Sequence, residues 1–147
     1  MIHDIELTTL AEIKDSRGSV KHFIKSTDED FVSFGEVYLS TVKCNVVKGW
    51  KKNLDVDQNF CCIQGIIKVV IYDDRNDSVS RGSIHAIILD SESTHSRLKI
   101  PKDLWYSFKC CSEETSTLLN FISTPHKFNR VKTLPISSSL IPFEWRE

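Results

Sequence analysis

The side chains that most often do chemistry in proteins are spread widely along this chain of 147 residues. The histidines occur singly, at His3, His22, His85, His95 and His126. Metal-binding β-barrels need clustered histidine and carboxylate ligands, so this spacing predicts no metal centre. We also expect no other cofactor.

The five cysteines include two adjacent pairs and are Cys44, Cys61, Cys62, Cys110 and Cys111. Neighbouring residues on a strand point to opposite faces, so neither pair can direct both thiols into one metal site. An odd number of cysteines also fits poorly with a secreted disulfide framework. The pattern favours buried, reduced thiols in a cytosolic protein.

Length and charge restrict the class of protein further. The chain has the size of one domain, and 19 basic and 20 acidic residues give a net charge of -1. This balance provides no strong positive field, so nucleic acid is not an expected partner. The N-terminal residues lack an export signal, and apolar runs such as Ala86–Leu89 are too short to cross a bilayer. We expect a soluble, cytoplasmic protein without a membrane partner.

The elements that must position any site are predicted to be strands. Short branched and aromatic runs alternate with polar turns, and no segment keeps a helical period over three turns. The predicted strands are residues 5–10, 19–24, 35–43, 60–63, 66–72, 83–89, 97–100, 107–110 and 117–121. Many short strands at this spacing are typical of an all-β sandwich or jelly-roll barrel.

Three connecting segments carry their own predictions. Gln64 and Gly65 separate two predicted strands and indicate a tight hairpin turn. A short helical turn is predicted around Asp28–Phe31. The final segment, residues 125–147, has weak strand signals, and we expect it to wrap over the surface.

Eight short motifs follow one another along almost the whole chain. They are Asp15–Gly18, Gly35–Ser40, Val47–Trp50, Gln58–Gly65, Tyr72–Arg75, Leu98–Pro101, Leu118–Asn120 and Ile141–Trp145. In this order they resemble the dTDP-4-dehydrorhamnose 3,5-epimerase family and its smaller cupin relatives. The resemblance implies one cupin jelly-roll domain over residues 1–147 and a metal-free homodimer. It also implies an N-terminal strand that crosses to the neighbour, and a substrate in each barrel mouth.

The chemistry that this resemblance implies is proton transfer beside a ketone. Hydrogens on the carbons next to a ketone are acidic, and inversion needs a base on one face and an acid on the other. Hydrogen-bond donors stabilise the enolate, and cationic side chains hold a diphosphate. The implied activity is epimerisation at C3 or C5, or both, of a dTDP- or CDP-linked 4-keto-6-deoxy sugar. The implied pathway is the synthesis of surface polysaccharide such as O-antigen.

Three residues occupy the family's catalytic or pocket positions. Lys51 stands where the family has its histidine base, and a lysine could act there only if burial or a cation such as Lys52 lowered its pKa. Alternatively, both lysines are solvated or bind phosphate. His126 stands at the position of the acid, a tyrosine in the family, or is an exposed bystander. Tyr106 replaces a second pocket histidine and is a candidate acid or enolate stabiliser, or a rim residue.

Further positions match the family's substrate-binding residues. They are Arg17, Lys48, Trp50, Asn53, Gln58, Asp73 and Asn120. Arg17 corresponds to an arginine that reaches across the dimer to the diphosphate, although the same motif makes an ordinary hairpin turn. Asp73 aligns with a pocket carboxylate and could instead form a structural ion pair with Arg75. Trp50 could stack on a base or sugar, or fill a core.

Two other functions stay open. Related 3,4-ketoisomerases have two histidines after the same glycine, at the places of Lys51 and Asn53. The chain could therefore be a ketoisomerase with altered catalytic groups. It could also be a catalytically silent cupin that only binds a sugar nucleotide.

Overall fold

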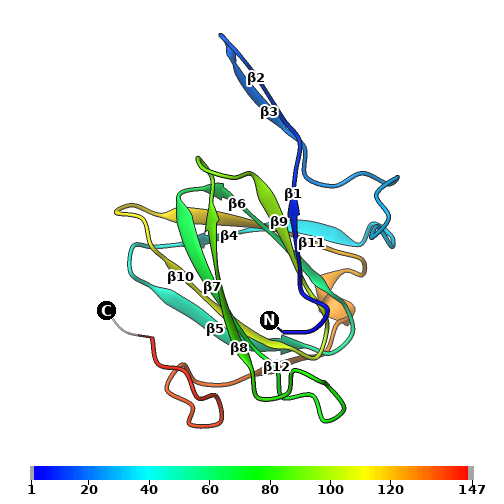
Figure 1. Ribbon diagram of the computed structural model, residues 1–147, viewed down its shortest axis with the longest axis vertical. Coiled ribbons are helices and arrows are strands. Elements are labelled where there is room, and N and C mark those ends of the chain that lie inside the picture. Colours follow the sequence, from blue (N-terminus) through cyan, green and yellow to red (C-terminus); the bar gives the residue numbers. More distant parts are fainter. Residues whose placement is uncertain (1, 146–147) are drawn as a thin grey trace.

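The computed structural model describes residues 2–145 and consists of two antiparallel sheets that face each other (Figure 1). The first sheet has the order β1 (Glu6–Thr9), β9 (Ser96–Ile100), β6 (Gln58–Gln64), β11 (Ser116–Ile122) and β4 (Glu36–Val42). The second has the order β12 (Val131–Thr133), β5 (Val47–Asn53), β10 (Trp105–Cys110), β7 (Ile66–Tyr72) and β8 (Ile84–Asp90). Within residues 2–145 the only helical element is the 3₁₀ turn η1 (His126–Phe128). The all-β prediction is confirmed.

The core lies between the two sheets. Phe60 and Leu118 come from the first sheet, Val69 and Phe108 from the second, and all four side chains are buried. The rings of Phe60 and Phe108 meet edge to face, with centroids 5.9 Å apart. Burying each such side chain contributes roughly 1.5–3 kcal/mol. Inward residues alternate with outward ones along regular strands such as β7, where Val69 belongs to this core and Val70 does not, as a two-sheet barrel requires.

The outer face of the second sheet carries its own apolar cluster. Trp50, Val70 and Trp105 point away from the first sheet and are covered by the chain that follows β12. Phe143 of that chain packs edge to face on Trp50, with ring centroids 6.3 Å apart. The prediction that the final segment wraps over the surface is thus confirmed as far as residue 145.

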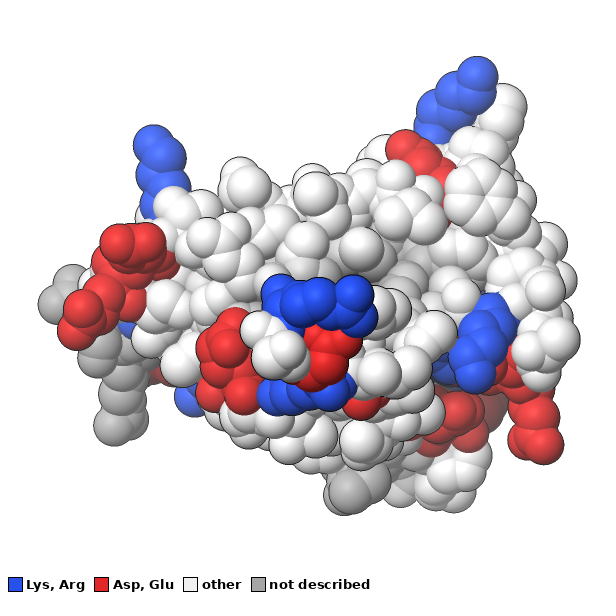
Figure 2. All heavy atoms as spheres, turned by 90° about the horizontal axis from the view of Figure 1, so that it is seen from above, with Lys and Arg blue, Asp and Glu red and all other residues white. Residues whose placement is uncertain are grey.

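A third, two-stranded sheet projects from the barrel as a hairpin of β2 (Glu12–Asp15) and β3 (Gly18–Lys21) (Figure 1). The Arg17 backbone N–H donates to Asp15 Oδ1 at 2.8 Å, which closes the tip. Figure 2 looks down on this end of the molecule. Charged side chains of both signs gather in the middle of that view, and further charged groups lie toward its left and right sides.

The strands that the sequence did not reveal are β2, β5 and β12. In β5, one glycine and three lysines hide the alternation that normally marks a strand. It is nevertheless a strand because it pairs with β10 on one side and with β12 on the other. β12 is only three residues long, and β2 has no packed face. Neither has an apolar pattern from which it could be predicted.

The predicted hairpin at Gln64 and Gly65 is wrong. β6 and β7 belong to different sheets, so these residues carry the chain from one sheet to the other. Gly65 has φ 77°, and an added Cβ would lie 2.5 Å from Ser116 Oγ, so only glycine fits. The segment Asp28–Phe31 is a turn closed by a 3.0 Å hydrogen bond from Phe31 N to Asp28 O, and no helix forms there.

Candidate functional site

A β-bulge on β5 turns two lysines toward the barrel interior. Residues three apart on a regular strand point to opposite faces. Here Lys48 pairs with Phe108 and Lys51 with Tyr106, and both partners belong to the core side of β10. The bulge makes this possible because Gly49 has φ 111° and lies so close to β10 that an added Cβ would be 2.8 Å from Tyr106 O.

These lysines are on the inward face of the second sheet, and Lys48 connects it to β4, the edge strand of the first sheet. The group termed the mouth consists of Tyr38, Lys48, Lys51, Gln58, Tyr106 and Asn120. Lys48 bridges it, since its Nζ donates to Ser40 Oγ at 3.1 Å and to the Thr41 carbonyl at 2.6 Å on β4. The mouth thus has one wall on each sheet.

Lys51 and Lys52 point in opposite directions. Lys51 is exposed on the mouth side. Lys52 is buried on the outer face, where its Nζ contacts the Asp74 carboxylate and lies 4.8 Å from the Trp105 ring centroid. Its charge is therefore paired away from Lys51. Asn53 lies at the end of β5, and its Oδ1 accepts from Asp55 N, at 3.0 Å, and from Val56 N, so it closes the following turn.

A chain of amide hydrogen bonds runs along the first-sheet wall. Asn120 Oδ1 accepts the Asn59 backbone N–H at 3.0 Å, and its Nδ2 donates to Gln58 Oε1 at 2.9 Å and to Tyr38 Oη at 2.7 Å. Gln58 Nε2 donates to the Val56 carbonyl at 3.3 Å. One backbone group at each amide fixes which atom is nitrogen and which is oxygen. The Tyr38 oxygen is consequently an acceptor in this chain.

Tyr106 lies on the second-sheet wall beside Lys51 and is almost completely buried. Its ring meets Phe60 edge to face, with centroids 5.3 Å apart. Burial raises the pKa of Tyr106 well above its usual range, and the nearby Tyr38 adds to this. Burial also raises the pKa of Tyr38, although the hydrogen bond from Asn120 partly opposes the shift. Both phenols therefore keep their protons at neutral pH.

His126 borders the mouth from η1. Its ring centroid is 6.0 Å from that of Tyr38, and its backbone N–H donates to Glu36 Oε2 at 2.7 Å. The side chain itself is exposed. The structure therefore brings His126 to the rim, next to a tyrosine and a carboxylate that the sequence did not single out.

Four predicted binding residues lie outside the mouth: Trp50, Arg17, Asp73, and Asn53, which closes the turn after β5. Trp50 is the extra residue of the bulge and is fully buried on the outer face of the second sheet. Arg17 lies at the tip of the β2–β3 hairpin, where its side chain is 88% exposed and its Nη2 is 2.7 Å from Asp15 Oδ2. Within residues 2–145, the contacts of Arg17 are those with Asp15 in its own turn.

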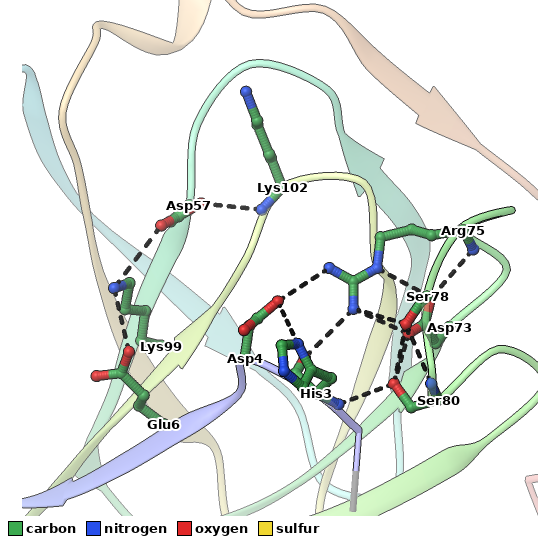
Figure 3. A network of polar contacts seen from close by, with 10 residues as sticks. All are labelled: His3, Asp4, Glu6, Asp57, Asp73, Arg75, Ser78, Ser80, Lys99 and Lys102. Atoms are coloured by element: carbon green, nitrogen blue, oxygen red, sulfur yellow. Dashed lines mark hydrogen bonds and ion pairs between the residues drawn. The ribbon is translucent and has the colours of Figure 1, made fainter.

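Asp73 is completely buried in a network of its own, the loop network of Asp73, Arg75, Ser78 and Ser80 (Figure 3). Its carboxylate accepts five hydrogen bonds, from the Arg75 backbone and guanidinium and from the two serine hydroxyls. Burial alone would raise the pKa of Asp73, but these donors outweigh it and hold the pKa well below the usual range. The predicted ion pair with Arg75 is confirmed, and none of the five donors belongs to the mouth.

The residues that sequence reasoning missed are on β4. Glu36, Tyr38 and Ser40 point inward, while Val37 and Leu39 are exposed on the outer face. Polar and apolar residues alternate along β4, and this alternation is the signal that the strand has one polar face. In most barrel strands the apolar face is inside, but in β4 the polar face is inside. The sequence alone does not say which face is inside.

Within the described part of the chain, no group of three or more His, Cys, Asp or Glu side chains could hold a metal. No helix there is long and apolar enough to span a membrane. A hollow of about 1440 Å³ lies over the outer face of the second sheet, lined by Lys68, Cys111 and Phe143 among others. The candidate site is nevertheless the mouth, because the paired walls and the protonated phenols are there.

Comparison with known families gives a match over most of the chain. The family described as FdtA: WxcM-like, C-terminal matches residues 3–130. A probable low-salt glycan biosynthesis epimerase, Agl13 of Haloferax volcanii, is 33% identical over 122 residues, which are 82% of this chain and 78% of that protein. The spore coat polysaccharide biosynthesis protein SpsL of Bacillus subtilis is 23% identical over 99% of this chain and 97% of its own length.

Solved structures give the same picture. A dTDP sugar isomerase from Desulfovibrio desulfuricans superposes with a TM-score of 0.94 and 30% identity, covering 98% of this chain and 92% of that one. A dTDP-4-dehydrorhamnose 3,5-epimerase from Bacillus anthracis has a TM-score of 0.82 and 18% identity, with 97% and 85% covered. The cupin jelly-roll prediction is thereby confirmed.

Proposed function

The chain belongs to the FdtA, WxcM-like family, and from this premise we propose that it catalyses proton transfer beside the ketone of a 4-keto-6-deoxy nucleotide sugar. Its relatives include a glycan biosynthesis epimerase and a dTDP sugar isomerase. The proposed reaction is epimerisation at C3 or C5, or both, during the synthesis of a surface polysaccharide such as O-antigen. The proposed location is the cytoplasm, where nucleotide sugars are made.

The observation that carries this proposal is the β5 bulge, because it turns Lys51 into the mouth beside Tyr106. In the proposed reaction, the amine of Lys51 removes the proton from the carbon next to the ketone. The electron pair of the broken C–H bond moves onto the ketone oxygen and gives an enolate. The protonated phenol of Tyr106 then supports that oxygen with a hydrogen bond, which is the kind of fixed donor that enolates require. We propose no metal or other cofactor in these steps.

Substrate binding is proposed to involve a second copy of the chain. The β2–β3 hairpin leaves its own barrel, so Arg17 could reach the diphosphate in a neighbour's mouth (Figure 1). The outer face of β4 supports a homodimer as well, because Val37 is 43% and Leu39 58% exposed there. Light scattering tests this directly: a dimer is expected, and a monomer at micromolar concentration contradicts it.

The decisive experiment uses dTDP- and CDP-linked 4-keto-6-deoxy sugars in heavy water, followed by NMR. Deuterium at C3 or C5 above the enzyme-free control is expected. No deuterium with either nucleotide, together with retained binding in calorimetry, would identify a silent sugar-nucleotide-binding cupin. If none of dTDP, UDP, GDP and CDP binds at millimolar concentration, the proposed nucleotide site is contradicted as well.

A 3,4-ketoisomerase is the second candidate, because a solved dTDP sugar isomerase covers nearly the whole chain at 30% identity. A ketoisomerase and an epimerase that acts at C3 both begin with removal of the C3 proton, so deuterium exchange at C3 alone does not separate them. The carbon spectrum of the product does: an epimerase leaves the ketone at C4, whereas a ketoisomerase moves it to C3.

A further inference from the structure

The first-sheet wall of the mouth contains a phenol whose hydrogen has a fixed direction. Asn120 Nδ2 can only donate, so the Tyr38 oxygen is the acceptor of their 2.7 Å hydrogen bond. The phenol hydrogen must then point elsewhere, and the residues that the structure describes offer it no acceptor. Tyr38 is on the inward face of β4, so this hydrogen is available to a molecule in the mouth.

The amide chain behind Tyr38 cannot reverse without losing backbone hydrogen bonds. A flip of the Asn120 amide would set its nitrogen against the Asn59 N–H, which is also a donor. A flip of Gln58 would set its oxygen against the Val56 carbonyl. Both amides are buried, and an unpaired buried donor or acceptor is costly. This series of amide hydrogen bonds therefore keeps the Tyr38 oxygen as an acceptor.

The two walls divide the proton chemistry. Lys51 and Tyr106 are cross-strand partners on the second sheet, so they approach a bound sugar from the same side. Tyr38 pairs with Asn120 on the first sheet and approaches from the opposite side. Inversion at carbon needs a base and an acid on opposite sides. His126 is on the same side as Tyr38, but among residues 2–145 its exposed side chain has no comparable hydrogen-bonded support.

On the premise of the proposed function, we propose that Tyr38 is the catalytic acid and that Asn120 and Gln58 are residues that position it. Lys51 Nζ takes the proton from carbon, and the electron pair of that C–H bond forms the enolate. The Tyr38 O–H bond then breaks, and its proton is delivered to the enolate carbon from the opposite side. Tyr38 is left as a phenolate and Lys51 as an ammonium ion, and proton exchange with solvent restores both.

The test compares Tyr38→Phe, His126→Asn and the wild type with the dTDP-linked 4-keto sugar in heavy water. Inversion by Tyr38→Phe is expected to fall roughly 10²- to 10⁴-fold, the usual loss for a general acid. Deuterium should still enter the recovered substrate, because Lys51 can return a solvent-derived deuteron to the same face. His126→Asn should invert at close to the wild-type rate.

Two results would overturn this assignment while leaving the proposed function intact. One is near wild-type inversion by Tyr38→Phe; the other is exchange without inversion in His126→Asn. A wild-type protein that neither exchanges nor inverts contradicts the proposed function itself, and the role of Tyr38 with it.

Asn120→Asp provides an independent readout. A carboxylate at this position would accept the Tyr38 hydrogen and turn it away from the mouth. Exchange without inversion is therefore expected here too, with dTDP affinity retained and the folded state verified by circular dichroism. If a folded Asn120→Asp protein inverts like the wild type, the positioning role is wrong.

Discussion

The mouth and the loop network are both clusters of mostly buried or half-buried polar side chains, and they use their hydrogen bonds differently. In the loop network, all five bonds to the Asp73 carboxylate come from three residues that follow it closely (Figure 3). In the mouth, the amide chain runs from the backbone to Tyr38, and the described residues 2–145 offer the phenol hydrogen no acceptor. We call the loop network closed because its own residues supply the donors to the carboxylate. We call the hydrogen-bond chain of the mouth open because it ends in the O–H donor of Tyr38.

This difference separates a structural cluster from a reactive one. A carboxylate that already accepts hydrogen bonds from its own loop stabilises that loop. It has few acceptor positions free for a ligand. A half-buried donor without a partner costs stability and gains only when a ligand accepts its hydrogen bond. Substitutions in the loop network should therefore change folding, and substitutions in the mouth should change turnover.

The largest effect is expected for Lys51→Met, which keeps the aliphatic chain and removes the amine. Turnover should fall roughly 10²- to 10⁴-fold, as for loss of a general base. The free energy of unfolding should hardly change, because the side chain is exposed. Lys52→Met is the matched control, since Lys52 points to the outer face and should leave turnover close to wild type. Equal losses in both variants would contradict the division between the two faces of β5.

Asp73→Asn tests the closed arrangement. The variant removes the Asp73 carboxylate from the Arg75 guanidinium, whose side chain is 22% exposed and which keeps, within residues 2–145, only the longer ion pair with Asp4, at 3.6 Å. We expect a loss of about 3 kcal/mol in the free energy of unfolding, the lower end of the range for a broken buried pair, because Arg75 keeps some hydration. Urea denaturation measures this. Turnover per folded molecule should stay near wild type, and a selective loss of turnover would return Asp73 to the substrate site.

Arg17→Ala tests the contribution of the hairpin. Binding of dTDP in calorimetry should weaken by about 1.5–3 kcal/mol, the range for a hydrogen bond to a charged group. Lys14→Ala removes another charge from the same hairpin and should have a smaller effect. Unchanged affinity in Arg17→Ala would mean that the arginine only closes its own turn with Asp15.

The sequence was sufficient for the fold class and for part of the mouth. Gln58 and Asn120 are each two residues from an apolar core residue of the same strand, Phe60 and Leu118, so their position inside the barrel could be predicted. Trp50 could not be placed, because its direction depends on the bulge beside it. That bulge depends on how closely Gly49 approaches β10, a contact between segments far apart in the sequence.

Tyr38 escaped prediction for a related physical reason. Its strand exposes apolar side chains and turns polar ones inward, the reverse of an ordinary barrel strand. The partner that gives Tyr38 its orientation, Asn120, is 82 residues away in the sequence. A single sequence records neither the orientation of a strand nor such a distant pairing.

The smallest expected effect concerns acid, and it also distinguishes the two regions. The pKa of Asp73 is lowered in the folded state, so its contribution to stability is fully present above the unfolded pKa of about 4. That contribution is lost as the pH falls through this value toward the lower folded pKa. Between pH 5 and pH 3 the wild type should therefore lose about 1 kcal/mol more than Asp73→Asn, which has no group to titrate there.

Urea denaturation at pH 5, 4 and 3 measures this difference, with Tyr38→Phe as the control. The phenol of Tyr38 stays protonated over the whole interval because its pKa is raised, so Tyr38→Phe should follow the pH dependence of the wild type. If Asp73→Asn also follows the wild type, other carboxylates dominate the acid response. The loop network would then be a weaker stabilising element than its five hydrogen bonds suggest, and the contrast between a closed and an open network would rest on turnover alone.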